Sequence, residues 1–60
     1  MSDQELVRDF LILSEMSQQE LADKLHFNRS NISKVVNGKQ KLSTFRRWMI
    51  EEELKQAYST

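Results

Sequence analysis

A repeated pattern of residues that start helices is the strongest constraint in this chain. Ser2 and Ser17 are each followed three positions later by a glutamate, so each serine can cap a helix while the glutamate returns a hydrogen bond to it. Asn28 is a favoured cap residue for a third helix, and Ser43 is a suitable cap for a fourth. The spacing of these caps predicts a bundle of short helices.

Composition agrees with an all-α fold and excludes several functions. The 60 residues include no proline and one glycine, whereas a sheet of this size needs more turn residues. With no cysteine and a single histidine, we expect no disulfide, no metal site and no cofactor. A chain this short buries only about 60% of its unfolded surface. The small core leaves no room for a catalytic cleft and no nucleophile–base pair is evident, so we expect no enzyme.

Apolar spacing sets the expected bounds of the helices. The four ranges are about 3–14, 18–25, 29–37 and 44–58. In the first range, Leu6, Phe10 and Leu13 recur on one face. The third range stops at Asn37-Gly38, where glycine adopts the left-handed conformation. We therefore expect one domain over residues 1–60, a small four-helix bundle, with a five-helix arrangement as the variant.

The fourth helix carries two apolar stripes on nearly opposite faces. We expect the first stripe to close the core, and it consists of Phe45, Trp48 and Met49. The second stripe consists of Ile50, Leu54, Ala57 and Tyr58. A spare apolar stripe on a terminal helix predicts a homodimer interface formed by these residues. The alternative is a bend near residues 51–53 that lets both stripes pack on one core.

Positive and negative charges are separated along the sequence, although the net charge is zero. Residues 24–50 contain seven lysines and arginines and no acid, whereas residues 1–23 contain six acids and one arginine. A basic surface formed by the middle of the chain would suit nucleic acid. The alternative is that the acidic ends pair with it inside the molecule, and charge by itself does not decide between the two.

The location of the protein is also constrained. No apolar run is long enough to span a membrane, and no signal-peptide pattern opens the chain. We expect a cytoplasmic, nucleoid-associated protein with no membrane partner.

The second and third predicted helices, joined by His26-Phe27-Asn28, form a helix-turn-helix pattern. The small Ala22 allows the two helices to cross closely. The runs 16–25 and 29–39 carry the letters SQ-x-ELA followed by I-x-x-x-x-NGK. This combination resembles the lambda-repressor-like, Cro-type helix-turn-helix domains, the XRE family.

The resemblance implies that the third helix enters the major groove of DNA. Arg29 is the strongest candidate for a base contact, because its fork matches the O6 and N7 acceptors of guanine. The candidates for base contacts as a group are Arg29, Ser30, Asn31, Ser33 and Lys34. In the family, the residue at the position of Gln18 contacts the DNA backbone. The phosphate candidates as a group are Gln18, Asn28, Asn37, Lys39 and Lys41.

His26 departs from the family pattern, which usually has glycine at this turn position. We expect a positive φ at His26, since histidine tolerates the left-handed region better than most residues. A role as metal ligand is disfavoured, because the sequence offers no partner histidine or cysteine.

The function that these features favour is sequence-specific binding of double-stranded DNA by a transcriptional repressor or regulator. A homodimer on a palindromic operator would place its recognition helices about 34 Å apart. We expect no small-molecule ligand. The alternative function is a protein-interaction module, an antirepressor or antitoxin, built on the same scaffold. That alternative calls for a neutral or acidic recognition face, whereas Arg29 and Lys34 make this face basic.

Overall fold

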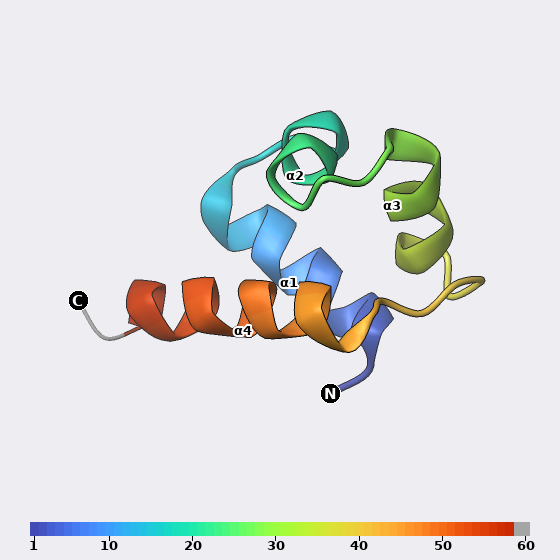
Figure 1. Cartoon of the computed structure of the whole chain (residues 1–60). Coiled ribbons are helices and arrows are strands. Elements are labelled where there is room, and N and C mark those ends of the chain that lie inside the picture. Colours follow the sequence, from blue (N-terminus) through green and yellow to red (C-terminus); the bar gives the residue numbers. More distant parts are fainter. Residues whose placement is uncertain (59–60) are drawn as a thin grey trace.

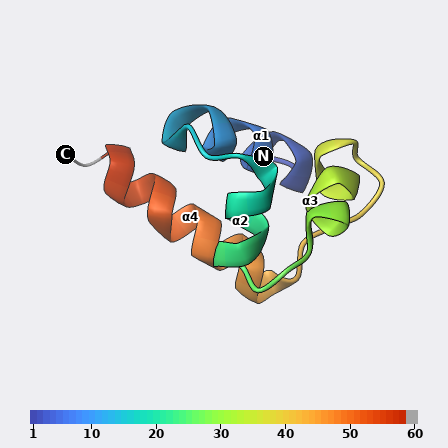
Figure 2. The ribbon, with the colours of Figure 1, turned by 90° about the horizontal axis from the view of Figure 1, so that it is seen from above.

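The computed structural model describes residues 1–58, with the side chains of residues 1–57, and these residues form four α-helices and no strand (Figure 1). The helices are α1 (Asp3–Ser14), α2 (Gln18–Lys24), α3 (Arg29–Val36) and α4 (Thr44–Tyr58). The predicted all-α class is confirmed. Helices α2 and α3 pack against each other, and α1 packs against both α3 and α4 (Figures 1 and 2).

All four helices begin at the cap residues that the sequence predicts. Ser2, Ser17, Asn28 and Ser43 each accept a hydrogen bond from the backbone N–H three positions later, at 3.2, 3.1, 3.1 and 3.2 Å. Both predicted capping boxes are complete. The hydrogen bonds that Ser17 donates from its backbone and side chain lower the pKa of Glu20. These local bonds satisfy backbone N–H groups that a helix start otherwise leaves without partners.

Each of the three connections between the helices contains one residue in the left-handed backbone region. His26 has φ of 54° and Gly38 has φ of 75°, as predicted. Glu15, which ends α1 with φ of 58°, is a third left-handed residue that the sequence analysis did not predict. At the end of α2, Phe27 N–H donates a hydrogen bond to the carbonyl of Ala22 at 2.8 Å. The reversal at His26 therefore has the bonding pattern of a glycine-terminated helix, with histidine in the strained position.

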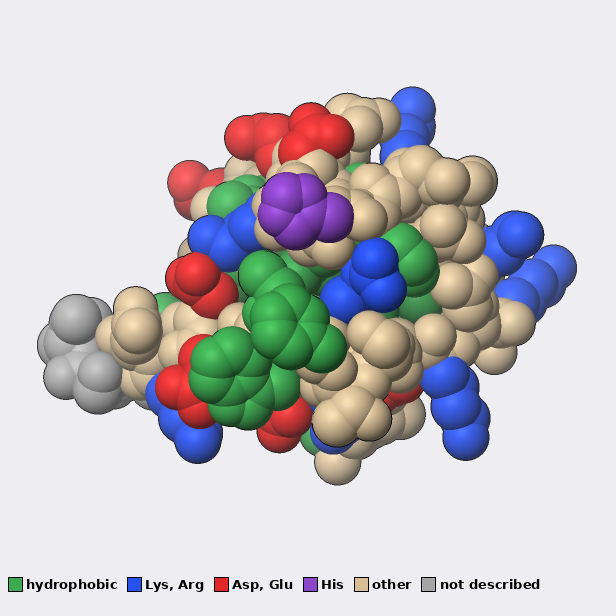
Figure 3. Space-filling model, in the orientation of Figure 1, with side chains coloured by type: hydrophobic (Ala, Val, Ile, Leu, Met, Phe, Trp, Pro, Cys, Tyr) green, Lys and Arg blue, Asp and Glu red, His purple; other side chains and the backbone are tan. Residues whose placement is uncertain are grey.

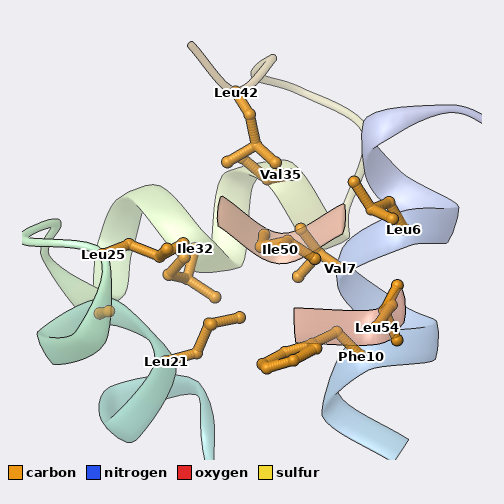
Figure 4. Close-up of a cluster of buried hydrophobic side chains, with 11 residues drawn as sticks. Leu6, Val7, Phe10, Leu21, Leu25, Ile32, Val35, Leu42, Ile50 and Leu54 are labelled. Atoms are coloured by element: carbon orange, nitrogen blue, oxygen red, sulfur yellow. The ribbon is translucent and has the colours of Figure 1, made fainter. Parts of the chain in front are cut away.

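The core lies where the four helices meet (Figure 4). Its fully buried large side chains come from every helix, and they are Val7, Leu21, Ile32, Val35 and Ile50. No polar or charged residue is buried among the described residues. In α1 the buried stripe consists of Leu6, Val7 and Phe10. Leu13, which we expected on this stripe, lies one turn beyond Phe10 near the end of α1 and is 49% exposed.

The prediction for the two faces of α4 was wrong. Ile50 and Leu54, expected in a dimer interface, are 1% and 8% exposed and belong to the core. Phe45 and Trp48, expected to close the core, are 66% and 54% exposed, while Met49 is partly buried against the core as expected. Ala57 is exposed, and the side chain of Tyr58 lies outside the described residues. α4 is one continuous helix that runs nearly straight in Figure 1, so the bend given above as the alternative is not seen.

An ion pair lies on the side of α4 that turns inward. Arg47 pairs with Asp3 at the start of α1, and Asp3 also accepts the Leu42 N–H at 2.8 Å. Because residues three and seven positions apart share a helix face, Arg47, Ile50 and Leu54 all lie on the side of α4 that faces α1. Burial disfavours the charged form of Asp3, but the bonds from Leu42 and Arg47 outweigh it and lower the pKa of this carboxyl.

Candidate nucleic-acid interface

The α2–α3 unit is held together by a small apolar contact beneath an exposed helix. Leu21, Ala22 and Ile32 are each fully buried. Ala22, with its single methyl group, permits the close approach of the two helices that the sequence predicts. The outer side of α3 stays free of this packing.

The candidates for base contacts fall on or beside the outer face of α3. Arg29, Ser30 and Lys34 are exposed, while Asn31 and Ser33 are partly buried at the flanks. Helical spacing places Ser30, Ser33 and Lys34 together, opposite the buried Ile32 and Val35. The five candidates therefore lie close together on one helix, and Arg29 stands at its N-terminal tip.

One of these side chains already has a structural role. Asn28 Oδ1 caps α3 by accepting the N–H of Asn31, and it also accepts a hydrogen bond from the Ser30 hydroxyl at 2.8 Å. The Ser30 Oγ retains its acceptor lone pairs, and Asn28 retains its side-chain amide N–H groups. Both residues can still face a ligand, although Ser30 is oriented by the cap.

The five phosphate candidates lie at the ends of helices and in the loop after α3. Gln18 is the first residue of α2 and is partly buried, whereas Asn28 and Asn37 are exposed at the two ends of α3. Lys39 and Lys41 are exposed in the loop between α3 and α4. This loop leaves α3 by a tight reversal in which Lys39 N–H bonds to the Lys34 carbonyl at 2.8 Å.

Four cations form a surface that we call the basic surface, and they are Arg29, Lys34, Lys39 and Lys41. None of them forms an ion pair with another described residue. In Figure 3, lysine and arginine side chains project from the edge occupied by α3 and its following loop, and acidic side chains gather elsewhere, partly over α2. Pairing with the acidic ends of the chain therefore does not neutralise this surface.

The other three cations of the middle segment have partners inside the molecule. Lys24 pairs with Glu53 at 2.9 Å, and Arg47 pairs with Asp3. Arg46 donates to the backbone carbonyls of Leu25 and His26, both at 3.1 Å. Arg46 and Arg47 are therefore engaged in contacts within the molecule and do not belong to the basic surface.

Sequence reasoning missed the contact between Arg46 and the helix-turn-helix. Besides its two hydrogen bonds, the guanidinium carbon lies 4.1 Å from the ring centroid of Phe27. No local pattern signals this contact, since it joins residues about twenty positions apart. Nothing in the sequence connects Phe27 with Arg46.

Two other kinds of site are absent from the part of the chain that the structure describes. None of its helices is long and apolar enough to cross a membrane. No group of three or more histidine, cysteine, aspartate or glutamate side chains in that part is arranged to hold a metal ion.

The fold and the exposed α3 define a helix-turn-helix protein, and comparison with known families agrees. A family model described as helix-turn-helix matches residues 7–55, which include all of α2 and α3 and most of α1 and α4. The chain belongs to the XRE family of lambda-repressor-like and Cro-like helix-turn-helix domains, a family of DNA-binding transcription regulators. Comparison with curated proteins and with solved structures gave no match.

Proposed function

We propose that this protein is a sequence-specific repressor of transcription that reads double-stranded DNA in the major groove with α3. The observation that carries the proposal is the exposed pair Arg29 and Lys34, which has no acidic partner among the described residues. A guanidinium fork at the tip of a helix can bond both major-groove acceptors of guanine. Repression would follow from occupancy of a promoter, and such a protein would act in the cytoplasm at the nucleoid.

Side chains around α3 are suited to the DNA backbone. Lys39 and Lys41 extend the positive charge beyond the end of α3, and Gln18 lies at the start of α2, where free N–H groups favour a phosphate. Asn28 and Asn37 flank α3 and offer amide donors. If about five such contacts form, affinity falls steeply as salt is added.

We further propose that two copies bind a palindromic operator as a homodimer, and that the contact uses Phe45 and Trp48. These rings are exposed, with centroids 6.0 Å apart. In Figure 3 a hydrophobic patch over the first turns of α4 faces the viewer, while the basic side chains of α3 project from the adjacent edge. The two-fold axis of such a dimer would lie in the plane of the patch and point towards that edge. The basic surfaces of both copies would then face the same side of the dimer.

The size of the aromatic patch predicts a weak contact. Aromatic side chains carry about 150–250 Å² each, so this half-exposed pair offers roughly 250 Å² per chain. A stable complex buries about 800 Å² per partner. We therefore expect the dimer to form mainly on DNA, where two adjacent half-sites raise the effective concentration of the chains.

Selection from a pool of random duplexes tests the first proposal. We expect an enriched sequence that the protein binds far more tightly than unrelated DNA, with affinity that falls as salt is raised. A protein that binds no duplex at low ionic strength would contradict DNA binding, and uniform affinity for all sequences would contradict base reading.

The dimer proposal has a separate test. With the selected operator, Trp48→Ser should weaken binding to the full palindrome while leaving the affinity for a single half-site unchanged. A matched control is Ile12→Ser, because Ile12 is also an exposed apolar residue but lies on α1. Equal binding of wild type and Trp48→Ser to the palindrome would place the contact between copies elsewhere.

A further inference from the structure

A single side chain of α4 holds three consecutive residues of the helix-turn-helix. Arg46 Nε donates to the Leu25 carbonyl at 3.1 Å, and Arg46 Nη2 donates to the His26 carbonyl at 3.1 Å. The same guanidinium lies over the ring of Phe27, 4.1 Å from its centroid. Ser43, the cap of α4, lies within 3.5 Å of Nη1 and helps to orient the group.

These contacts lie at the joint between α2 and α3. The carbonyls of Leu25 and His26 follow the last turn of α2, where backbone acceptors have no intrahelical partner. His26 adopts a left-handed conformation that costs free energy in a residue other than glycine. Phe27 directly precedes Asn28, the cap from which α3 begins. The guanidinium therefore stabilises the strained turn and fixes the point from which α3 departs.

Arg46 is poorly placed to act as a phosphate contact itself. Its side chain is partly buried, and the Nε and Nη2 groups are already occupied by carbonyl oxygens. Lys34 and Lys39, by contrast, are exposed and form no ion pair with any residue in the described part of the chain. Planar stacking and a forked pair of donors are properties of arginine that lysine lacks.

We propose that Arg46 is a positioning residue for DNA recognition: it sets the orientation of α3 relative to the rest of the protein, and through this orientation it controls sequence discrimination. The inference rests on the proposed function, because it assigns the control of base reading to a residue that does not touch DNA. A recognition helix that is free to shift keeps its charge near the duplex but loses the alignment of its base contacts.

The experiment compares Arg46→Ala and Arg46→Lys with a matched control, Lys24→Ala. Lys24 also joins the end of α2 to α4, but its ion pair is with Glu53 and does not involve residues 25–27. Arg46→Ala and Lys24→Ala each remove one positive charge and one contact between α4 and the C-terminal end of α2. Arg46→Lys keeps the charge and most of the stem, so it separates the loss of the fork from the loss of charge. Circular dichroism establishes which variants are folded.

Affinity for the selected operator and for an unrelated duplex is then measured at several salt concentrations. We expect both Arg46 variants to lose about tenfold in affinity for the operator, comparable to one misread base pair, with less than about a twofold change for unrelated DNA. The dependence of affinity on salt should keep its wild-type slope, because no phosphate contact is lost. Lys24→Ala should keep the wild-type ratio between the two duplexes.

A second measurement needs no DNA. Amide hydrogen exchange should be about tenfold faster in α3 of the Arg46 variants, relative to α1, and unchanged in Lys24→Ala.

Two results of the binding measurements would overturn the inference. One is an unchanged ratio of affinities in both Arg46 variants, which would leave Arg46 as a stability contact only. The other is an equal loss on both duplexes with a salt slope reduced by about 0.9, which would make Arg46 a phosphate contact. If the wild-type protein binds no DNA, the proposed function fails, and unchanged hydrogen exchange in α3 of the variants would separately refute the positioning role.

Discussion

Asp3 and Arg47, 44 positions apart in the sequence, form an ion pair that joins the start of α1 to the first half of α4. The pair is largely shielded from solvent, since the two side chains are 15% and 31% exposed. Asp3 also accepts the N–H of Leu42, so one carboxylate binds both the loop before α4 and Arg47 of α4 itself.

The lowered pKa of Asp3 makes stability depend on pH in a defined direction. A carboxyl with a depressed folded-state pKa stabilises the protein above its ordinary pKa, and this contribution disappears as the pH falls through the folded-state value. Asp3→Asn should therefore lower the free energy of unfolding by about 1 kcal/mol at neutral pH. Below about pH 4 the difference from wild type should shrink. Denaturant titrations at several pH values provide the measurement, with Asp9→Asn as control; a difference that persists unchanged at low pH would contradict the assignment.

The inward face of α4 can be tested by substitution. Ile50→Ala should lower the free energy of unfolding by about 2–5 kcal/mol, because the side chain is 1% exposed and leaves a cavity. Trp48→Ser should change it by less than about 1 kcal/mol, as expected at an exposed position. Thermal unfolding followed by circular dichroism measures both. A larger loss for Trp48→Ser than for Ile50→Ala would mean that α4 packs through the opposite face.

Arg29→Ala tests direct base reading. The substitution should cost about 1–3 kcal/mol in binding of the selected operator, with helicity unchanged, because a bidentate contact to guanine is lost. Arg8→Ala is the control, since Arg8 is an exposed arginine on α1. Fluorescence anisotropy with labelled duplexes gives the affinities. An unchanged affinity for the operator would remove Arg29 from the base contacts.

Lys39→Ala tests the extension of the basic surface into the loop. We expect affinity to fall by a similar factor for all sequences, and the slope of log affinity against log salt to decrease by about 0.9. Lys55→Ala, at the far end of α4 and paired with Glu52, should leave both quantities unchanged. A loss confined to the operator would mean that Lys39 reads sequence instead of binding phosphate.

The left-handed turn at His26 predicts a stabilising substitution. His26→Gly should raise the free energy of unfolding by roughly 0.5–1 kcal/mol, because glycine adopts a φ of 54° without steric cost and the exposed imidazole contributes little packing. Such a gain raises the melting temperature of a small domain by several degrees. Asn37→Gly is the matched control at a φ of −90°, where no gain is expected. Equal effects at the two positions would contradict strain at His26.

Local signals were enough to predict the positions of all four helices. A cap such as Ser17 and a stop such as Gly38 act within a few residues of the backbone they terminate, so the sequence displays both partners together. The positive φ of His26 was predictable for the same reason. Likewise, the spacing of Ile32 and Val35 identified the buried side of α3, and thereby the exposed side that carries Arg29 and Lys34.

The faces of α4 could not be predicted in this way. Apolar residues occur on several sides of this helix, so periodicity does not select one of them. The inward side of α4 also carries Arg47, whose partner Asp3 is 44 positions away in the sequence, so no local pattern shows their contact. Arg46 illustrates the same difficulty at the candidate site, because its partners are backbone carbonyls of Leu25 and His26 in the turn after α2, about twenty positions away.

The outward position of Trp48 gives this protein a built-in optical reporter. It is the single tryptophan in the sequence, and its indole is 54% exposed beside the ring of Phe45. An indole in water emits at longer wavelength than one in an apolar environment, so unfolding should shift its emission only slightly. Docking of a second copy would instead shift the emission to shorter wavelength, which makes fluorescence of the unlabelled protein a direct readout of assembly on DNA.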